Sequence, residues 1–156
     1  MIEQPTHSDL MQSFTHFLES KKLRKTPERF AILEKVWKMR VHFDVEELYL
    51  ALEADAYHVS RATVYNTIDL LCECGILRKH QFSSHQAQYE LAGGNHFHLI
   101  CTQCGKIKEV KNEEFINPFM RLKYAAFTPS YFSAYLYGLC SVCVRHNKKI
   151  KKNNEK

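Results

Sequence analysis

Long apolar runs are missing from this sequence of 156 residues. No stretch approaches the ~20 consecutive apolar residues that a membrane helix needs, so we expect no bilayer span. The first ten residues carry Glu3 and Asp9 and lack the basic start and apolar core of a signal peptide. Internal repeats are also missing. We therefore expect a cytoplasmic protein, whose six cysteines stay reduced and need a role other than disulfide formation.

The composition, 45% apolar and 25% charged, indicates a folded globular chain with room for one domain or two small ones. The formal net charge of +5 lies at the C-terminal end, because residues 145–156 hold six basic side chains against Glu155. Residues 21–40 hold eight more against Glu28 and Glu34. Such a cluster can face nucleic-acid phosphates, but charge runs are more often solvated helix faces. Charge alone leaves both interpretations open.

The first half of the sequence reads as helices. Apolar residues at helical spacing mark the first one: Leu10, Phe14, Phe17 and Leu18. The pair Thr26-Pro27 predicts the next helix start, with a hydroxyl cap and proline at the first helical position. Asp44, with Glu47 three residues later, predicts a third start. Ser60 predicts a fourth helix over residues 61–74, which Gly75 ends.

From Gly75 the pattern changes to short strands at residues 76–80 and 87–91, which together predict a hairpin. Helices followed by such a hairpin outline a winged helix-turn-helix. Residues 83–88 and the Gly93-Gly94 pair are the expected joint. Beyond it, the elements expected in a β-β-α-β order are residues 96–101, 107–110, 113–125 and 131–139.

We therefore predict an α+β chain with three parts. Residues 1–85 form a winged-helix domain and residues 86–146 a small α/β domain. The lysine-rich and asparagine-rich residues 147–156 are too polar to pack, and we expect this basic tail to be disordered.

The strongest chemical signal is the pair of motifs Cys101-x-x-Cys104 and Cys140-x-x-Cys143. Each motif can present two thiolates to one tetrahedral Zn²⁺. Redox-active dithiols and plain buried cysteines are the alternatives, but two pairs in a reducing compartment favour structural zinc. Four thiolates leave no open coordination position, which argues against a catalytic metal. Cys72 lacks a matching partner, and core packing is its simpler role.

A second signal is His96-Phe97-His98, because alternate residues of a strand project their side chains from one face. Two surface histidines are the common alternative. The carboxylates of Glu90 and Glu109 lie on the neighbouring predicted strands. Two imidazoles with two carboxylates form a mixed nitrogen and oxygen site that suits Fe²⁺, Mn²⁺, Co²⁺ or Zn²⁺.

Taken together, several short motifs resemble the ferric uptake regulator (Fur) family of metal-dependent repressors, from about Leu23 to Cys143 and in the family's order. They are Lys25-Thr26-Pro27-Glu28-Arg29, His42 before Glu46-Glu47-Leu48-Tyr49, Ala62-Thr63-Val64-Tyr65, Tyr89-Glu90-Leu91, His96-x-His98-Leu99-Ile100-Cys101-x-x-Cys104-Gly105-Lys106, and Tyr137-Gly138-Leu139-Cys140-Ser141-Val142-Cys143.

This resemblance implies an N-terminal DNA reader and a C-terminal dimerisation domain, working as a homodimer on double-stranded, A·T-rich palindromic operators. It also implies a regulatory metal site that adds His42 to Glu90, His96, His98 and Glu109. A metal bound by ligands from both domains would fix the angle between them. In a dimer this angle sets the separation of the two recognition helices, so the metal would raise DNA affinity.

Two departures from the family pattern matter. Members often carry a further histidine-rich metal site, but the corresponding positions here are Asn95, Phe97 and Phe132, so we expect two metal sites per chain. The position after Tyr65, often arginine in the family, is Asn66, so the preferred operator can differ.

The helix beginning at Ser60 is the expected recognition helix, since a helix-turn-helix presents the N-terminal end of its second helix to base edges. Candidate base contacts near this end are Ser60, Arg61, Thr63, Tyr65 and Asn66. Candidate phosphate or minor-groove contacts are Arg24, Lys25 and Arg29. The alternative for Tyr65 is packing inside the domain; Val64, Ile68 and Leu71 already supply that face, so we expect it to be exposed.

Other functions compete with an Fe²⁺ sensor that controls iron-uptake genes. Peroxide-sensing and zinc-sensing repressors share the family framework, but peroxide sensors typically use aspartates where this chain has Glu90 and Glu109. A zinc hydrolase built on His96 and His98, or an adaptor that binds only protein, belongs to another class. We expect no enzyme, because no separate set of base and nucleophile accompanies the histidines.

Overall fold

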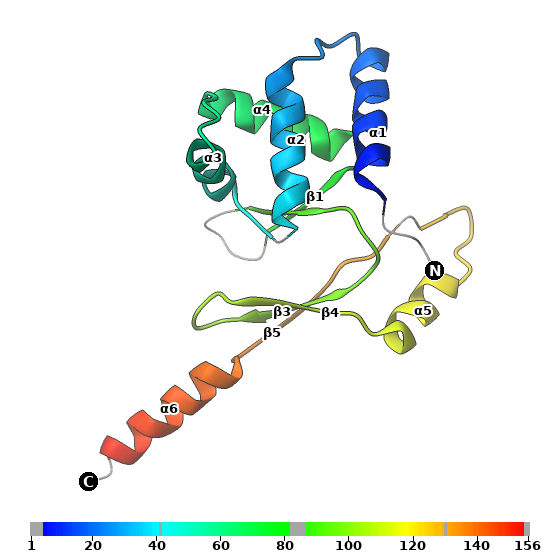
Figure 1. Cartoon of the computed structure of the whole chain (residues 1–156). Helices are drawn as coiled ribbons and strands as arrows, with labels where there is room; N and C mark the ends of the chain where they lie inside the picture. Colours follow the sequence, from blue (N-terminus) through cyan, green and yellow to red (C-terminus); the bar gives the residue numbers. More distant parts are fainter. Residues whose placement is uncertain (1–4, 41, 82–86, 130, 155–156) are drawn as a thin grey trace. The chain divides into compact units, whose positions relative to one another are not determined.

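A computed structural model describes residues 5–40, 42–81, 87–129 and 131–154 (Figure 1). The chain divides into two compact units, residues 1–94 and 95–156. The boundary lies nine residues beyond the predicted one at residue 85, because the second hairpin strand pairs within the first unit. The predicted joint at 83–88 lies partly outside the described residues, since 82–86 are not among them.

The first unit contains four helices and a hairpin. The helices are α1 His7–Ser20, α2 Pro27–Met39, α3 Val45–Ala54 and α4 Arg61–Glu73, and the strands are β1 Leu77–His80 and β2 Gln88–Leu91. β1 and β2 are antiparallel, with Arg78 opposite Glu90 and His80 opposite Gln88. With α3 and α4 as the helix pair and the hairpin as the wing, the predicted winged helix-turn-helix is confirmed.

Helix boundaries in this unit follow the capping chemistry. The Asp44 carboxylate accepts from the backbone N–H of Glu47, whose own side chain accepts from the N–H of Asp44. The Ser60 hydroxyl likewise caps α4 through the N–H of Thr63. The predicted hydroxyl cap at Thr26 is wrong: this residue occupies the cap position, but its side chain makes no capping bond. Proline at the first helical position, which removes one unpaired N–H, sets this start.

The core of the first unit is formed by the apolar faces of its helices and hairpin. Its fully buried members include Phe14, Leu18, Ile32, Leu33, Leu48, Val64, Ile68 and Leu71. At the end of α4, Gly75 adopts a φ of 78° that other residues rarely tolerate. The N–H groups of Gly75 and Ile76 then close the helix end on the carbonyls of Cys72 and Leu71. This closure sends the chain directly into the wing.

The second unit is a small sheet with two helices. Its elements are β3 Phe97–Cys101, β4 Ile107–Val110, α5 Glu113–Arg121, β5 Ala134–Gly138 and α6 Ser141–Asn154. The strand order is β4-β3-β5, with β4 antiparallel and β5 parallel to β3. The predicted β-β-α-β order is therefore present, with a shorter helix and a shorter last strand. None of the helices described here combines the length and the hydrophobicity of a membrane span.

The tail predicted to be disordered from residue 147 is instead helical as far as Asn154. Polarity argues against packing, but lysine is itself a good helix former. The helix also starts inside the second cysteine motif, where the N–H of Val144 donates to the carbonyl of Cys140 at 3.0 Å. In addition, the side-chain amides of Gln103 and Asn147 exchange two hydrogen bonds, at 3.0 and 3.4 Å. Nucleation by the cysteine motif and this amide pair therefore support a helix that the composition alone did not predict.

Candidate metal centres and nucleic-acid interface

The four cysteines of the two motifs converge in the second unit. Cys101 ends β3, Cys104 follows in the tight turn, and Cys140 and Cys143 flank the start of α6. Gly105, with a φ of 72°, lets the turn fold back so that its N–H donates to the carbonyl of Cys101 at 2.9 Å. The four Sγ atoms all lie within 4.8 Å of one another.

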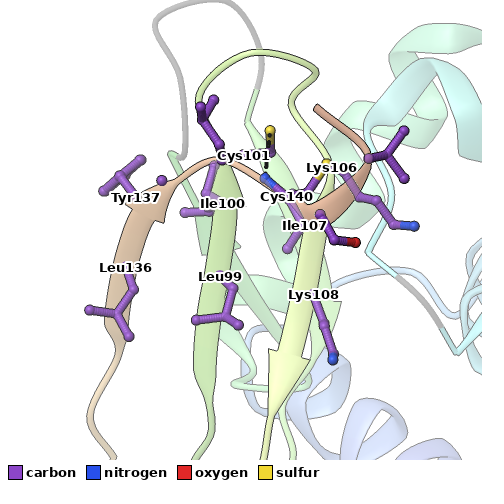
Figure 2. A pocket seen from close by; sticks show the side chains of 13 residues that line it. Leu99, Ile100, Cys101, Lys106, Ile107, Lys108, Leu136, Tyr137 and Cys140 are labelled. Atoms are coloured by element: carbon purple, nitrogen blue, oxygen red, sulfur yellow. Dashed lines mark hydrogen bonds between the residues drawn. The ribbon is translucent and has the colours of Figure 1, made fainter. Parts of the chain in front are cut away.

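The sulfur spacing suits a tetrahedral metal. Four thiolates at Zn–S bonds of about 2.3 Å place neighbouring sulfurs roughly 3.8 Å apart. The Sγ atoms of Cys104 and Cys140 lie 3.8 Å apart, and Figure 2 shows Cys101 and Cys140 meeting at one end of the sheet. The geometry and the donor set therefore both fit Zn²⁺.

The backbone already favours a thiolate at this cluster. The N–H of Cys140 donates to Cys101 Sγ at 3.3 Å, and with the N–H of Cys104 it lowers the pKa of the Cys101 thiol to about 6. Burial, with the sulfurs nearby, raises the pKa of Cys143 to about 12. Negative charge thus gathers at Cys101 and resists further thiolates, and a divalent cation would relieve this repulsion. Outside the cluster, burial also raises the pKa of Cys72, to about 11.

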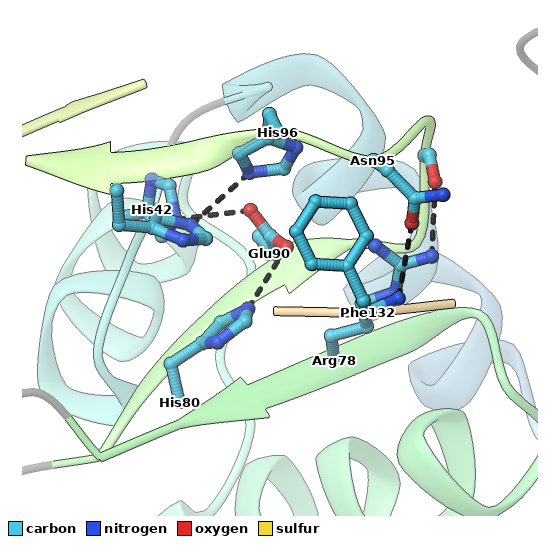
Figure 3. A network of polar contacts seen from close by, with 9 residues as sticks. His42, Arg78, His80, Glu90, Asn95, His96 and Phe132 are labelled. Atoms are coloured by element: carbon cyan, nitrogen blue, oxygen red, sulfur yellow. Dashed lines mark hydrogen bonds and ion pairs between the residues drawn. The ribbon is translucent and has the colours of Figure 1, made fainter. Parts of the chain in front are cut away.

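The first unit contributes a buried carboxylate held by two imidazoles. Glu90 on β2 accepts from His42 Nε2 at 2.9 Å through Oε2 and from His80 Nε2 at 2.8 Å through Oε1. Figure 3 shows both rings reaching this carboxylate. The Glu90 and His80 side chains are only 6% and 2% exposed. The expected ligands His42 and Glu90 therefore lie together.

His80 is a functional candidate that the sequence reasoning missed. Its side chain lies on the same face of the hairpin as Glu90, because the register places Arg78 opposite Glu90 and His80 opposite Gln88. That register is set by packing and by the hairpin connection, neither of which the alternation of apolar residues shows.

The second unit contributes the other two imidazoles. His96 precedes β3, His98 lies on it, and their Nε2 atoms are 3.1 Å apart. Two cis ligands with bonds of about 2.1 Å to one metal lie roughly 3 Å apart, so this spacing suits a shared ion. His98 is buried and stacks on Tyr135. Glu109 lies opposite His98 in the register of β3 and β4, and its side chain is exposed.

The positions of the family's additional metal site form an aromatic cluster. Phe97 makes edge-to-face contacts with Phe115 and Phe132, at centroid distances of 6.0 and 5.9 Å. Asn95 uses its side-chain oxygen to accept from the N–H of Phe132 at 3.3 Å. These contacts pack α5 on the sheet through apolar rings.

A hollow in the first unit collects several of the expected DNA contacts. Arg29 at the start of α2 lines it together with three residues from the start of α4: Ser60, Thr63 and Asn66. His58, whose side chain is 76% exposed, lines the same hollow and was missed by the sequence reasoning. Tyr65 on α4 is 52% exposed, as expected.

Other expected DNA contacts are engaged within the first unit. Arg61 binds the Glu46 carboxylate, with its Nη2 at 2.6 Å, and lies over the Tyr49 ring. This hydrogen bond lowers the pKa of Glu46. Lys25 pairs with Glu19 at 2.5 Å, and the Arg29 guanidinium donates to the carbonyl of Arg24. A DNA phosphate would have to compete for these cations, while Tyr65 and Asn66 are exposed.

Known proteins similar to this chain are metal-dependent regulators of one family. The family profile described as "Ferric uptake regulator family" matches residues 20–124. The peroxide-responsive repressor PerR of Staphylococcus aureus is 31% identical over 123 residues, 78% of this chain and 82% of its own. The ferric uptake regulator of Pseudomonas aeruginosa, solved with manganese, is 25% identical with a TM-score of 0.72, covering 81% of this chain and 97% of its own. That of Vibrio cholerae is 27% identical with a TM-score of 0.61, covering 81% and 98%.

The cysteine cluster generates the first prediction. The purified protein should carry one tightly held zinc per chain, and Cys104→Ser should lose it together with much of the thermal stability. The reason is that structural zinc binding is folding free energy, on the order of 10 kcal/mol in peptide models. Elemental analysis and thermal melting measure both effects, and Cys72→Ser is the matched control that keeps the metal. A Cys104→Ser/Cys143→Ser protein with full zinc content and an unchanged melting curve would contradict the assignment.

Proposed function

Because this chain belongs to the ferric uptake regulator family, we propose that it is a metal-responsive transcriptional repressor that senses Fe²⁺. A structural Zn²⁺ at the four cysteines would hold the second unit together, and a second, regulatory metal would raise DNA affinity. The proposed regulatory ligands are His42, Glu90, His96, His98 and Glu109.

The observation that carries this proposal is the presence of a buried half-site on each side of the joint. The first unit supplies the pair His42 and Glu90, and the second supplies His96 and His98. Six Cα–Cα steps separate Glu90 from His96, which limits their separation to roughly 20 Å. One ion could therefore bind ligands from both units and hold them at one angle. Glu109, directly opposite His98 on β4, would complete the set.

Metal and DNA would then favour the same conformation. A dimer binds two half-sites of a palindrome only when its recognition helices match the spacing of the major groove. A metal that fixes the angle between the units would fix that spacing, and each ligand would raise the affinity of the other. The expected operator is double-stranded, A·T-rich and palindromic.

Dimerisation through the second unit is supported by its exposed apolar side chains. Leu136, Tyr137 and Val142 are 56–59% exposed and line a hollow beside β5 (Figure 2). Within the described residues, β5 is an edge strand that pairs with β3 only. Apolar groups and open backbone on one face favour a second copy of the chain as its cover. We propose a homodimer on this basis.

A regulator is better supported than a hydrolase. Both oxygens of Glu90 already accept hydrogen bonds from imidazoles, which argues against this carboxylate as a general base. Four thiolates at the cysteine cluster likewise leave no open position for a reacting water. We therefore propose no enzymatic activity, and a cytoplasmic location where the thiols stay reduced.

A second candidate is a peroxide-responsive repressor, which the 31% identity to PerR favours. The two glutamates favour iron sensing by the resemblance to the family. Dilute peroxide separates the candidates, because Fe²⁺ reacts with it readily and Mn²⁺ does not. A peroxide sensor loses DNA binding only when loaded with iron, whereas an iron sensor keeps it with either metal over the same exposure.

The domain-bridging role of His42 gives the second prediction. His42→Ala should keep the zinc and the dimer but lose most of the metal-induced gain in DNA affinity. Allosteric couplings of ~1–3 kcal/mol correspond to about 5–150-fold. The measurement is a titration of operator DNA at several Fe²⁺ or Mn²⁺ concentrations, with the exposed His16→Ala as control. If His42→Ala binds DNA weakly at every metal concentration, His42 has only a structural role. If the variant keeps the full metal-induced gain in DNA affinity, the bridging mechanism is wrong.

The His80 contact gives the third prediction. A hydrogen bond that orients a ligating carboxylate typically changes metal affinity about 10–100-fold. His80→Ala should therefore weaken regulatory metal binding by that range, while His80→Gln, which keeps a donor, should recover most of it. Co²⁺ titration of the zinc-loaded protein measures the affinity, and the cobalt absorption bands report coordination. If His80→Gln is as defective as His42→Ala, His80 is itself a ligand.

The exposed face of α4 gives the fourth prediction. Tyr65→Ala should reduce discrimination between operator and random DNA, because its ring can contact thymine methyl groups in the major groove. Arg29→Ala should instead weaken both by a similar factor and lower the salt slope by roughly one unit. Fluorescence anisotropy on both duplexes distinguishes the two. Equal losses on both duplexes for Tyr65→Ala would remove it from base reading.

A further inference from the structure

α6 carries an uncompensated basic face. The helix, Ser141–Asn154, holds five Lys or Arg residues and no Asp or Glu. Arg145, Lys148 and Lys149 are exposed and follow the i, i+3, i+4 spacing that places side chains on one side of a helix. Within the described residues none of these three takes part in an ion pair.

The first unit, by contrast, carries no net positive charge. Residues 1–94 hold 11 Lys or Arg and 13 Asp or Glu, a formal net charge of −2. At least five of those cations are already paired, in Lys21–Glu73, Lys25–Glu19, Lys35–Asp55, Lys38–Glu34 and Arg61–Glu46. A unit with this balance can read bases, but its own charge provides little attraction to a phosphate backbone.

The basic face of α6 is held on an anchored element. Cys140 and Cys143 fix the start of the helix, and the Gln103–Asn147 amide pair ties its second turn to the first cysteine turn. Charges on an anchored helix lose less conformational entropy on binding than charges on a free tail. The arrangement therefore favours an ordered electrostatic contact.

We propose that α6 is a phosphate-binding arm that adds to the contact of Arg29 and supplies most of the sequence-independent, salt-dependent part of the DNA affinity, while α4 reads the bases. Duplex DNA carries one negative charge per ~1.7 Å of helix axis, and each neutralised phosphate releases counterions. An exposed row of cations on a protein whose reading unit is net negative matches that requirement. The inference rests on the proposed function, because it assumes that the chain binds double-stranded DNA.

The test neutralises the basic face without removing the helix. Arg145→Gln/Lys148→Gln/Lys149→Gln keeps good helix formers, which circular dichroism verifies. Binding to a random-sequence duplex is measured by anisotropy from about 50 to 200 mM salt, where each lost phosphate contact changes the slope by roughly 0.9. The slope should fall by up to about three per chain. The ratio of operator to random affinity should stay unchanged.

A matched control separates a local contact from a change in net charge. Lys108→Gln/Lys111→Gln/Lys123→Gln removes three exposed cations from the same unit but outside α6, and its slope should stay close to that of the parent. The proposal is overturned if the α6 variant and the parent have equal salt slopes. It is also overturned if the slope of the control variant falls as much as that of the α6 variant. Binding of both proteins to vesicles of anionic phospholipid is measured in parallel. If the α6 variant loses vesicle binding but keeps the DNA binding of the parent, the proposal is overturned and the basic face contacts a membrane instead. A parent protein that binds no DNA with or without metal overturns the proposed function itself.

Discussion

A buried carboxylate is the constraint on which much of the first unit depends. Glu90 is almost fully buried, and an uncompensated charge in such a place would cost several kcal/mol. Compensation comes from one imidazole at each oxygen, His42 from the segment before α3 and His80 from β1. These contacts tie three distant segments to one point and favour a single hairpin register. The same carboxylate that stabilises the wing is the one proposed above as a metal ligand.

The division of charge between the units complements this arrangement. The first unit has a formal net charge of −2, and it leaves aromatic and amide groups exposed at the start of α4. Base edges are read by such groups, whereas phosphates are attracted by net positive charge. If α6 supplies that charge, affinity and specificity reside on different elements and can change separately. A substitution in either element then alters one property with little effect on the other.

The sequence predicted most of what depends on local chemistry. Asp44 and Ser60 are helix caps as expected, and the two cysteine motifs converge as their spacing indicated. Failures arose where nonlocal contacts decide. The contact of His80 with Glu90 depends on the hairpin register, and the helical tail depends on Gln103 meeting Asn147 from 44 residues away. The proposal of His42 as a regulatory ligand came from family resemblance, since its spacing from Glu90 in the sequence carries no signal.

The aromatic cluster around Phe97 has a consequence for how the protein would measure metal. Rings that pack α5 on the sheet hold that region independently of the ion supply, and chelators cannot loosen them. With the zinc held by four thiolates, only one exchangeable ion per protomer would then vary with conditions. Such a sensor has a single threshold concentration rather than a graded series of occupancies. Its response steepness would come from coupling between the two protomers on DNA and not from successive filling of sites within one chain.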